Sequence, residues 1–257
     1  MKMLSKIKLA ELRSLRSRKF REKLRLSFVE GEIAVREILA GTAKVKYLVF
    51  SESKRADLSA KFETKAESFN LSDAEFAEIS DTVNSQGVLA VLEYPQLVEM
   101  NAIEKFDKIL VFDGVQDPGN VGTLIRSAAA FGVELIVALS GTAEIMNPKV
   151  LRSAAGHIYK LKFVQGVKTK EFAEFITEKN FNAFAADMQG EDIYSCSFES
   201  PWMLILGNEG AGISDDFRNE KIQLVKISHD KNVDSLNVGV AGSVILSWIY
   251  KQGHGNR

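Results

Sequence analysis

Short apolar runs alternate with amphipathic segments along residues 107–257. The runs typical of buried strands span 108–113, 133–139, 158–164, 182–187, 203–207 and 223–227. Segments with helical spacing of apolar residues lie between most of these runs, at 121–131, 148–156, 170–179 and 237–251. Such an alternation predicts an α/β fold with a mostly parallel sheet and helices on both faces.

Residues 1–95 show a second, shorter α/β alternation. Apolar runs at 45–50 and 87–92 predict strands, and Ser72–Glu75 has the pattern of a capping box before a helix. Residues 28–31 are expected to form a loop that leads into a helix at 34–39. The mixed polarity of residues 96–106, directly after Pro95, indicates a linker between a small domain (1–95) and a larger one (107–257).

The composition is that of a globular protein. Of the 257 residues, 46% are hydrophobic and 26% are charged, and there are only 4 prolines. The longest nearly apolar stretch, at 238–250, is short and contains Gly and Ser, so we expect no membrane span. The chain shows no signal-peptide pattern, and its single cysteine, Cys196, cannot form an intrachain disulfide. These features favour a cytoplasmic location.

The net charge of -1 hides a strong asymmetry. Residues 1–25 carry ten Lys or Arg residues against two Glu residues, so the remainder of the chain is acidic. A basic N-terminal arm favours a polyanionic partner such as nucleic acid, because neutralised phosphates release their counterions. The same arm also fits the solvated face of a helix, since Leu4, Ile7, Leu12 and Leu15 recur near helical spacing.

Three polar clusters stand at the carboxyl ends of predicted strands, where ligands bind in open α/β sheets. The usual dinucleotide, P-loop and zinc motifs are missing from the sequence. The first cluster, 113–122, contains Asn120 as a possible helix cap and is followed by Arg126. The second, 206–213, is a glycine-rich turn whose bare backbone could approach a ligand closely. The third, 234–242, opens an apolar helix rich in small residues.

These clusters resemble, in order, the three motifs of the SpoU (TrmH) family of RNA ribose 2'-O-methyltransferases. The first family motif has the form D-P-x-N-x-G-x-x-x-R-x-A with F-G after it, and it matches residues 117–132. The second, G-N-E-x-x-G, matches 207–212, and the third, S-L-N-V, matches 235–238. Residues 28–31 and 82–91 are similar to the small substrate-binding domain often attached to this family.

The resemblance implies a catalytic domain with a deep trefoil knot, a homodimer, and S-adenosylmethionine as the cofactor, with no metal and no membrane partner. It implies cofactor contacts from Ala186, Asp187, Leu206, Gly207, Asn208, Glu209, Gly210, Ile227, Ser235 and Leu236. It implies catalytic or substrate-holding roles for Asn120, Arg126, Glu209, Ser235 and Asn237. One departure is Ser228-His229, which stands where the family usually has Pro-Met, so the cofactor loop is expected to have a different shape.

Arg126 is expected to position the target phosphate or the developing alkoxide, because a guanidinium with a pKa above about 12 does not give up its proton. Glu209, Ser235 and the RNA phosphate are the candidate proton acceptors, whereas His157 and His229 fall outside the motifs. In this context the basic arm is predicted to contact RNA through Arg16, Arg18, Lys19, Arg21 and Arg25, together with Arg126 in the catalytic domain.

The main functional hypothesis is methylation of a ribose in 23S ribosomal RNA, since the small domain resembles that of rRNA-modifying members. A tRNA ribose 2'-O-methyltransferase is a close alternative. A non-catalytic RNA-binding factor for ribosome assembly is an alternative of a different class, and cofactor binding would separate it from the two enzymes.

Overall fold

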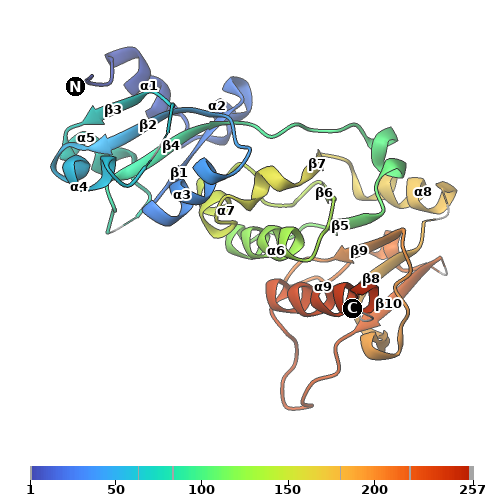
Figure 1. Ribbon diagram of the computed structural model, residues 1–257. Helices are drawn as coiled ribbons and strands as arrows, with labels where there is room; N and C mark the ends of the chain where they lie inside the picture. Colours follow the sequence, from blue (N-terminus) through green and yellow to red (C-terminus); the bar gives the residue numbers. More distant parts are fainter. Residues whose placement is uncertain (1, 63, 83, 180, 220, 255–257) are drawn as a thin grey trace. The chain divides into compact units, whose positions relative to one another are not determined.

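The strands predicted along residues 107–257 form one parallel sheet in the computed structural model of the protein (Figure 1). The strands are β5 (Lys108–Phe112), β6 (Leu135–Ala138), β7 (Lys162–Gln165), β8 (Ala183–Asp192), β9 (Trp202–Leu206) and β10 (Ile222–Lys226). They lie in the order β10-β8-β9-β5-β6-β7, and each neighbouring pair is parallel. The strand predicted at 158–164 is wrong in its first half, because His157–Lys160 form a 3-10 helix.

The structure describes residues 2–62, 64–82, 84–179, 181–219 and 221–254, and the chain divides into two units. Unit 1 comprises residues 1–95 and 144–160, and unit 2 comprises 96–143 and 161–257. Two segments differ from the division expected from the sequence. Residues 144–160, expected in the larger domain, pack within unit 1, and the expected linker 96–106 packs within unit 2.

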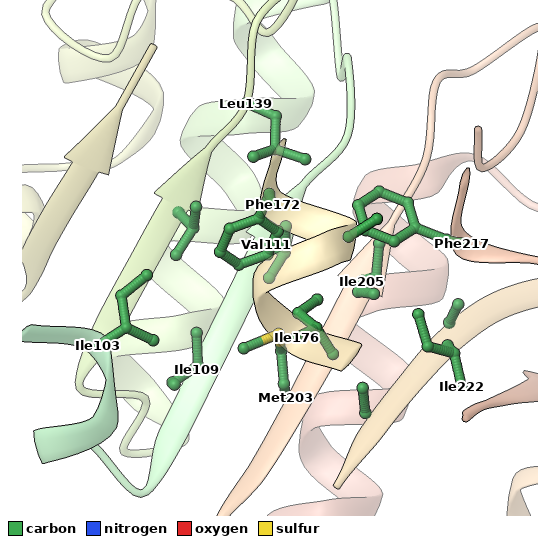
Figure 2. Packing of buried hydrophobic residues seen from close by; sticks show 14 of the residues in the cluster. Ile103, Ile109, Val111, Leu139, Phe172, Ile176, Met203, Ile205, Phe217 and Ile222 are labelled. Carbon is green, nitrogen blue, oxygen red and sulfur yellow. The ribbon is translucent and has the colours of Figure 1, made fainter. Parts of the chain in front are cut away.

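Helices cover both faces of the parallel sheet of unit 2, as the alternating pattern predicted. They are α6 (Pro118–Ala130), α8 (Thr169–Lys179) and α9 (Val238–His254). Phe172 and Ile176 of α8 cover one face, where alternate residues of the strands such as Val111 point toward them (Figure 2). Ile103, from the expected linker, belongs to the same buried cluster, which explains why this segment is part of the unit.

The opposite face of the sheet carries α6 and α9, which pack against each other. Gly242 allows α9 to lie directly on β9, because a Cβ atom there would stand 2.5 Å from the Leu206 side chain.

Asp117 caps α6 by accepting a hydrogen bond from the Asn120 N–H at 3.0 Å, and Pro118 follows at the first helical position. The expectation that Asn120 is the cap is therefore wrong.

Unit 1 contains a second, mixed sheet in the order β1-β4-β2-β3. Its strands are β1 (Leu26–Glu30), β2 (Val45–Ser51), β3 (Ser68–Leu71) and β4 (Val88–Glu93). Its helices are α1 (Lys6–Ser14), α2 (Arg18–Leu24), α3 (Glu32–Ala40), α4 (Arg55–Ser59), α5 (Asp73–Ile79) and α7 (Pro148–Ser153). The predicted loop at 28–31 is wrong, because residues 28–30 pair with β4, whereas the capping box at Ser72 and Glu75 is confirmed.

The basic N-terminal segment is folded onto unit 1 rather than extended as an arm. Leu4, Leu9, Leu12 and Leu15 join the core under the sheet, while Ile7 is 84% exposed. Leu9 therefore takes the buried place that the spacing assigned to Ile7. The basic side chains of residues 1–25 are exposed or partly exposed, with the exception of Arg21. Among the described residues, no helix is both long and apolar enough to cross a membrane.

A buried ion pair fixes residues 144–160 within unit 1. Arg21 and Glu144 form a two-pronged pair, with Nε to Oε1 at 2.9 Å, and their side chains are only 5% and 8% exposed. Arg21 also donates to the Leu15 carbonyl oxygen, and Tyr94 donates to Glu144 at 3.1 Å. This makes Arg21 a structural residue and overturns its prediction as an RNA contact.

We expect Arg21→Met to destabilise the protein by about 3–5 kcal/mol, because it leaves the Glu144 carboxylate buried without its partner. The measurement is urea unfolding followed by circular dichroism. Arg18→Met is the matched control: Arg18 is 64% exposed, and within the described part of the chain its ion pair is with Glu22 alone, so a change within about 0.5 kcal/mol is expected. Arg21→Met/Glu144→Leu should recover most of the loss, and equal effects of Arg21→Met and Arg18→Met would contradict the structural role.

Candidate functional site

A cavity of about 630 Å³ opens at the carboxyl ends of β8, β9 and β10 in unit 2. It is lined by all ten residues for which the sequence predicted cofactor contacts: Ala186, Asp187, Leu206, Gly207, Asn208, Glu209, Gly210, Ile227, Ser235 and Leu236. Parallel strands bring their carboxyl ends to one edge, so segments 40 or more residues apart in the chain converge there. The sequence reasoning missed other lining residues, including Met188, Gln189, Arg218 and Lys226.

An excursion of β8 builds one wall of the cavity. The pairing of β8 with β10 jumps from Ala185 opposite Leu224 to Glu191 opposite Val225, so residues 186–190 leave the ladder. The chain returns at Gly190, where a Cβ atom would stand 2.4 Å from the backbone of Leu224 and Val225. Only glycine fits this close approach, which places Asp187 and its neighbours along the cavity wall.

The glycine-rich turn after β9 folds back on itself. The N–H of Asn208 donates to the Gly212 carbonyl oxygen at 2.8 Å, and the Gly212 N–H donates back at 2.9 Å. A Cβ atom on Gly207 would stand 2.3 Å from Gly212, so this closure requires glycine. The Asn208 side chain accepts from the N–H groups of Gly210 and Ala211 and donates to the Gly114 carbonyl oxygen, which ties the turn to the first motif.

The Glu209 carboxylate joins the second motif to the first. It accepts hydrogen bonds from the backbone N–H groups of Gln116 and Asp117, each at 3.1 Å, and from the Asn120 amide at 3.0 Å. Burial, the largest single effect, raises the pKa of Glu209, but the hydrogen bond from Asn120 and those from the backbone N–H groups together lower it below its usual range. Glu209 is therefore ionised near neutral pH.

Asn120 and Asn237 extend this network to the third motif. The Asn237 amide donates to Asn120 Oδ1 at 3.0 Å, so a continuous chain of hydrogen bonds links Asn237, Asn120 and Glu209. Asn237 Oδ1 also accepts from the N–H groups of Gly239 and Val240 and caps α9. The three motifs, more than 100 residues apart at their extremes, thus form one polar assembly at the rim of the cavity.

Ser235 and Arg126 occupy different surroundings. Ser235 lines the cavity, next to Leu236 and Asn237. Arg126 is exposed on α6 and is absent from the cavity lining, and the structure gives its guanidinium no hydrogen bond or ion pair with the residues that it describes. Its side chain is accordingly accessible to an incoming anion.

Side-chain hydrogen bonds shape the loop in which Ser228 and His229 replace the usual Pro-Met. The Ser228 hydroxyl donates to Asp192, and this bond, followed by one from the Tyr194 N–H, lowers the pKa of Asp192. His229 Nδ1 lies 2.8 Å from the Ile227 carbonyl oxygen, and its Nε2 lies 3.0 Å from that of Val233. His229 holds both ends of a short turn in the cavity wall.

The remaining predicted RNA contacts lie on the surface of unit 1. Arg16, Arg18, Lys19 and Arg25 are all exposed, in contrast to Arg21. Arg18 pairs with Glu22 at 2.7 Å, Arg16 donates to the Glu78 carbonyl oxygen, and the Arg25 guanidinium stacks 4.4 Å from the Tyr94 ring centre. Much of the basic charge of residues 1–25 is thus balanced within the unit.

The cavity fits S-adenosylmethionine in size and in the character of its walls. Its volume lies within the range of about 300–1,000 Å³ typical of small-molecule sites. Leu206, Ile227, Leu236 and Ile245 supply apolar surface, and the turn at Gly207 brings bare backbone to the wall. Among the described residues, no group of three or more His, Cys, Asp or Glu side chains is arranged to hold a metal ion.

Comparison with known proteins gives consistent matches for both units. Residues 107–247 match the SpoU rRNA Methylase family, and residues 5–90 match the MRM3-like substrate binding domain. The 23S rRNA (guanosine(2553)-2'-O)-methyltransferase of Bacillus subtilis is 30% identical over 241 residues, which cover 93% of this chain and 94% of that protein.

Solved structures agree with these matches. A TrmH-family RNA methyltransferase structure from Porphyromonas gingivalis is 29% identical, with a TM-score of 0.79 over 96% of this chain and 98% of its own. The fold also matches the SpoU methyltransferase AviRb of Streptomyces viridochromogenes bound to its cofactor AdoMet, at 23% identity and a TM-score of 0.83, covering 98% and 100% of the two chains. Since the family match spans more than half of its residues, this chain belongs to the SpoU rRNA methylase family.

Proposed function

We propose that this protein transfers a methyl group from S-adenosylmethionine to the ribose 2'-hydroxyl of a nucleotide in 23S rRNA. The observation that carries the proposal is the hydrogen-bonded assembly of Glu209, Asn120 and Asn237 at the rim of a cofactor-sized cavity. The relative from Bacillus subtilis, which is matched over nearly its whole length, supports the choice of 23S rRNA.

S-adenosylmethionine, when bound, supplies an electrophilic methyl group on a sulfonium. The attack of a ribose oxygen on this group is an in-line displacement, so the protein must align the oxygen and manage its proton. Asn120 and Asn237 hold the first and third motifs together through their amides, which fixes the floor on which the ribose would lie. Ser235, in the cavity wall, stands where it could contact the reacting oxygen.

Glu209 is best assigned to loop assembly rather than to proton transfer. Its carboxylate already accepts from three N–H donors of the first motif, and its lowered pKa makes it a weak base. Ser235 and the phosphate of the RNA remain the candidate proton acceptors. Arg126, exposed on α6, would position that phosphate or stabilise the developing alkoxide.

We further propose that unit 1 binds the RNA, with phosphate contacts from Arg16, Arg18, Lys19 and Arg25. These side chains are exposed, and residues 5–90 match a substrate-binding domain. A homodimer, a trefoil knot around the cavity loops, the lack of a metal requirement and a cytoplasmic location remain part of the proposal. The 51% exposed Val240 on α9 is a candidate residue of the dimer surface.

Methyl transfer from labelled S-adenosylmethionine should label a 2'-O-methyl nucleoside in 23S rRNA taken from cells that lack this protein. The measurement is nucleoside analysis of the digested RNA by chromatography and mass spectrometry. rRNA from cells that contain the protein is the control and should accept little label. Label found in tRNA instead would favour the tRNA alternative, and transfer to neither RNA without cofactor binding would favour a non-catalytic RNA-binding factor.

Glu209→Gln should weaken S-adenosylmethionine binding about 10-fold or more and reduce turnover, because its NH2 group would face N–H donors. The lowered pKa means that the carboxylate stabilises the loops above its unfolded pKa, and that this contribution is lost as the pH falls through the lower folded pKa. The titration of Glu209 should therefore not change the turnover rate between about pH 6 and 8. Cofactor titration checks the affinity, and Glu199→Gln, an exposed carboxylate outside the site, is the control.

Arg126→Lys should lower turnover about 10- to 100-fold, since a lysine cannot form the two-pronged hydrogen bond of a guanidinium with a phosphate or alkoxide. Cofactor affinity should stay within about 2-fold of wild type, because Arg126 does not line the cavity. Single-turnover kinetics and cofactor titration test the two statements separately, with Thr123→Ala on the same exposed side of α6 as the control. Wild-type turnover in Arg126→Lys would exclude the positioning role.

A further inference from the structure

A second charged group, distinct from the three motifs, lies in the wall of the cavity. Arg218 Nη2 pairs with Asp187 Oδ2 at 2.7 Å, and both residues line the cavity. The Asp187 side chain is 9% exposed and that of Arg218 is 34% exposed. A charge pair in the wall of a ligand cavity, with its carboxylate largely buried, calls for a chemical explanation, because desolvating that carboxylate costs more than an apolar wall would.

The local structure holds Arg218 in place. It directly follows a short 3-10 helix (Asp215–Phe217), and its N–H donates to the Asp215 carbonyl oxygen at 2.9 Å. Phe217, one residue earlier, is fully buried and packs edge-on against Phe172 in the core. The guanidinium is therefore anchored at its backbone by the core and at its tip by Asp187.

The contacts of the pair leave N–H donors of Arg218 unused. Asp187 uses Oδ2 for Arg218 and Oδ1 for the Gln189 N–H at 2.9 Å. Arg218 has five N–H donors, and among the described residues its one other ion pair is a long one, 3.6 Å from Nε to Asp215 Oδ1. Its Nη1 has no hydrogen-bond partner among the residues that the structure describes.

The other basic side chains of the cavity have partners elsewhere. Both ring nitrogens of His229 face backbone carbonyl oxygens. Lys226 lies opposite Asp192 in the ladder between β8 and β10, and its charge acts on that carboxylate. Among the described residues that line the cavity, Arg218 is the cation with a fixed position and unused N–H donors. Its guanidinium is planar, and this geometry suits a carboxylate.

We propose that Arg218, oriented by Asp187, binds the carboxylate of the methionyl group of S-adenosylmethionine. This inference rests on the proposed function, which supplies the ligand, and it adds a residue outside the three motifs. A buried carboxylate needs a cationic or hydrogen-bonding partner, and a fixed guanidinium provides both. Asp187 acts as a positioning residue, because its Oδ2 holds the guanidinium of Arg218 and its Oδ1 is tied to the Gln189 N–H.

Two ligands that differ at the carboxylate test the proposal by isothermal titration calorimetry. S-adenosylhomocysteine carries the amino-acid group, whereas 5'-methylthioadenosine keeps the adenosine and the sulfur but lacks that group. Wild type should bind S-adenosylhomocysteine more tightly than 5'-methylthioadenosine. Arg218→Gln should weaken S-adenosylhomocysteine about 10- to 100-fold and change 5'-methylthioadenosine by less than about 2-fold.

Two further variants keep the test decisive. Asp187→Asn/Arg218→Gln removes the carboxylate that Arg218→Gln leaves unpaired, and it should show the same selective loss. Lys226→Gln removes the other Lys or Arg side chain lining the described cavity, and it should keep the wild-type ratio of the two affinities.

If Arg218→Gln keeps the wild-type ratio of the two ligand affinities, whether both are unchanged or both are weakened equally, the role of Arg218 is overturned. The proposed function is then still intact. If Lys226→Gln, and not Arg218→Gln, selectively weakens S-adenosylhomocysteine, then Lys226 binds the carboxylate. That result would likewise refute the inference. A wild-type protein that binds neither ligand would instead overturn the proposed function, so the two failures are distinguishable.

Discussion

The organisation of the site depends on the carboxylate of Glu209. A glycine-rich turn, a helix start and a long loop carry many backbone polar groups that need partners, and hydrogen bonds from a few side chains supply them. One anion that accepts two backbone N–H groups and the Asn120 amide does this for the first two motifs, and the bond from Asn237 to Asn120 adds the third. The same bonds that lower the pKa of Glu209 make its carboxylate a weak base.

The cavity wall shows two ways of fixing a loop without a regular element. Where relatives usually carry a proline in the last loop, this chain has Ser228 and His229, whose side chains bond to Asp192 and to the carbonyl oxygens of Ile227 and Val233. On the facing wall, Gly190 lets the chain return against β10, and the Asp187–Arg218 pair closes the resulting excursion. In the last loop, polar side-chain contacts take the place of the rigid proline ring. The shape of the site therefore depends on specific side chains.

The basic N-terminal segment shows why net charge is a weak guide to a binding surface. Arg21, Arg18 and Lys2 are paired with Glu144, Glu22 and Glu67, so ten basic residues leave far fewer uncompensated charges. The leucines between them enter the core of unit 1. RNA contacts must therefore come from those cations that stay exposed after folding, and Arg21 instead holds residues 144–160 in place.

The sequence by itself determined most of the elements and the chemistry of the site: apolar runs predicted the strands of the parallel sheet, and the family resemblance identified ten residues that line the cavity. These features depend on local backbone preference and on the rule that parallel strands end at one edge. Tertiary structure alone decided which polar side chains became partners. Arg21 and Glu144 are 123 positions apart and Asn237 and Asn120 are 117 apart, and no local pattern encodes such contacts. Whether a basic or acidic side chain meets solvent, a ligand or a buried counter-charge is fixed only when the core brings distant segments together.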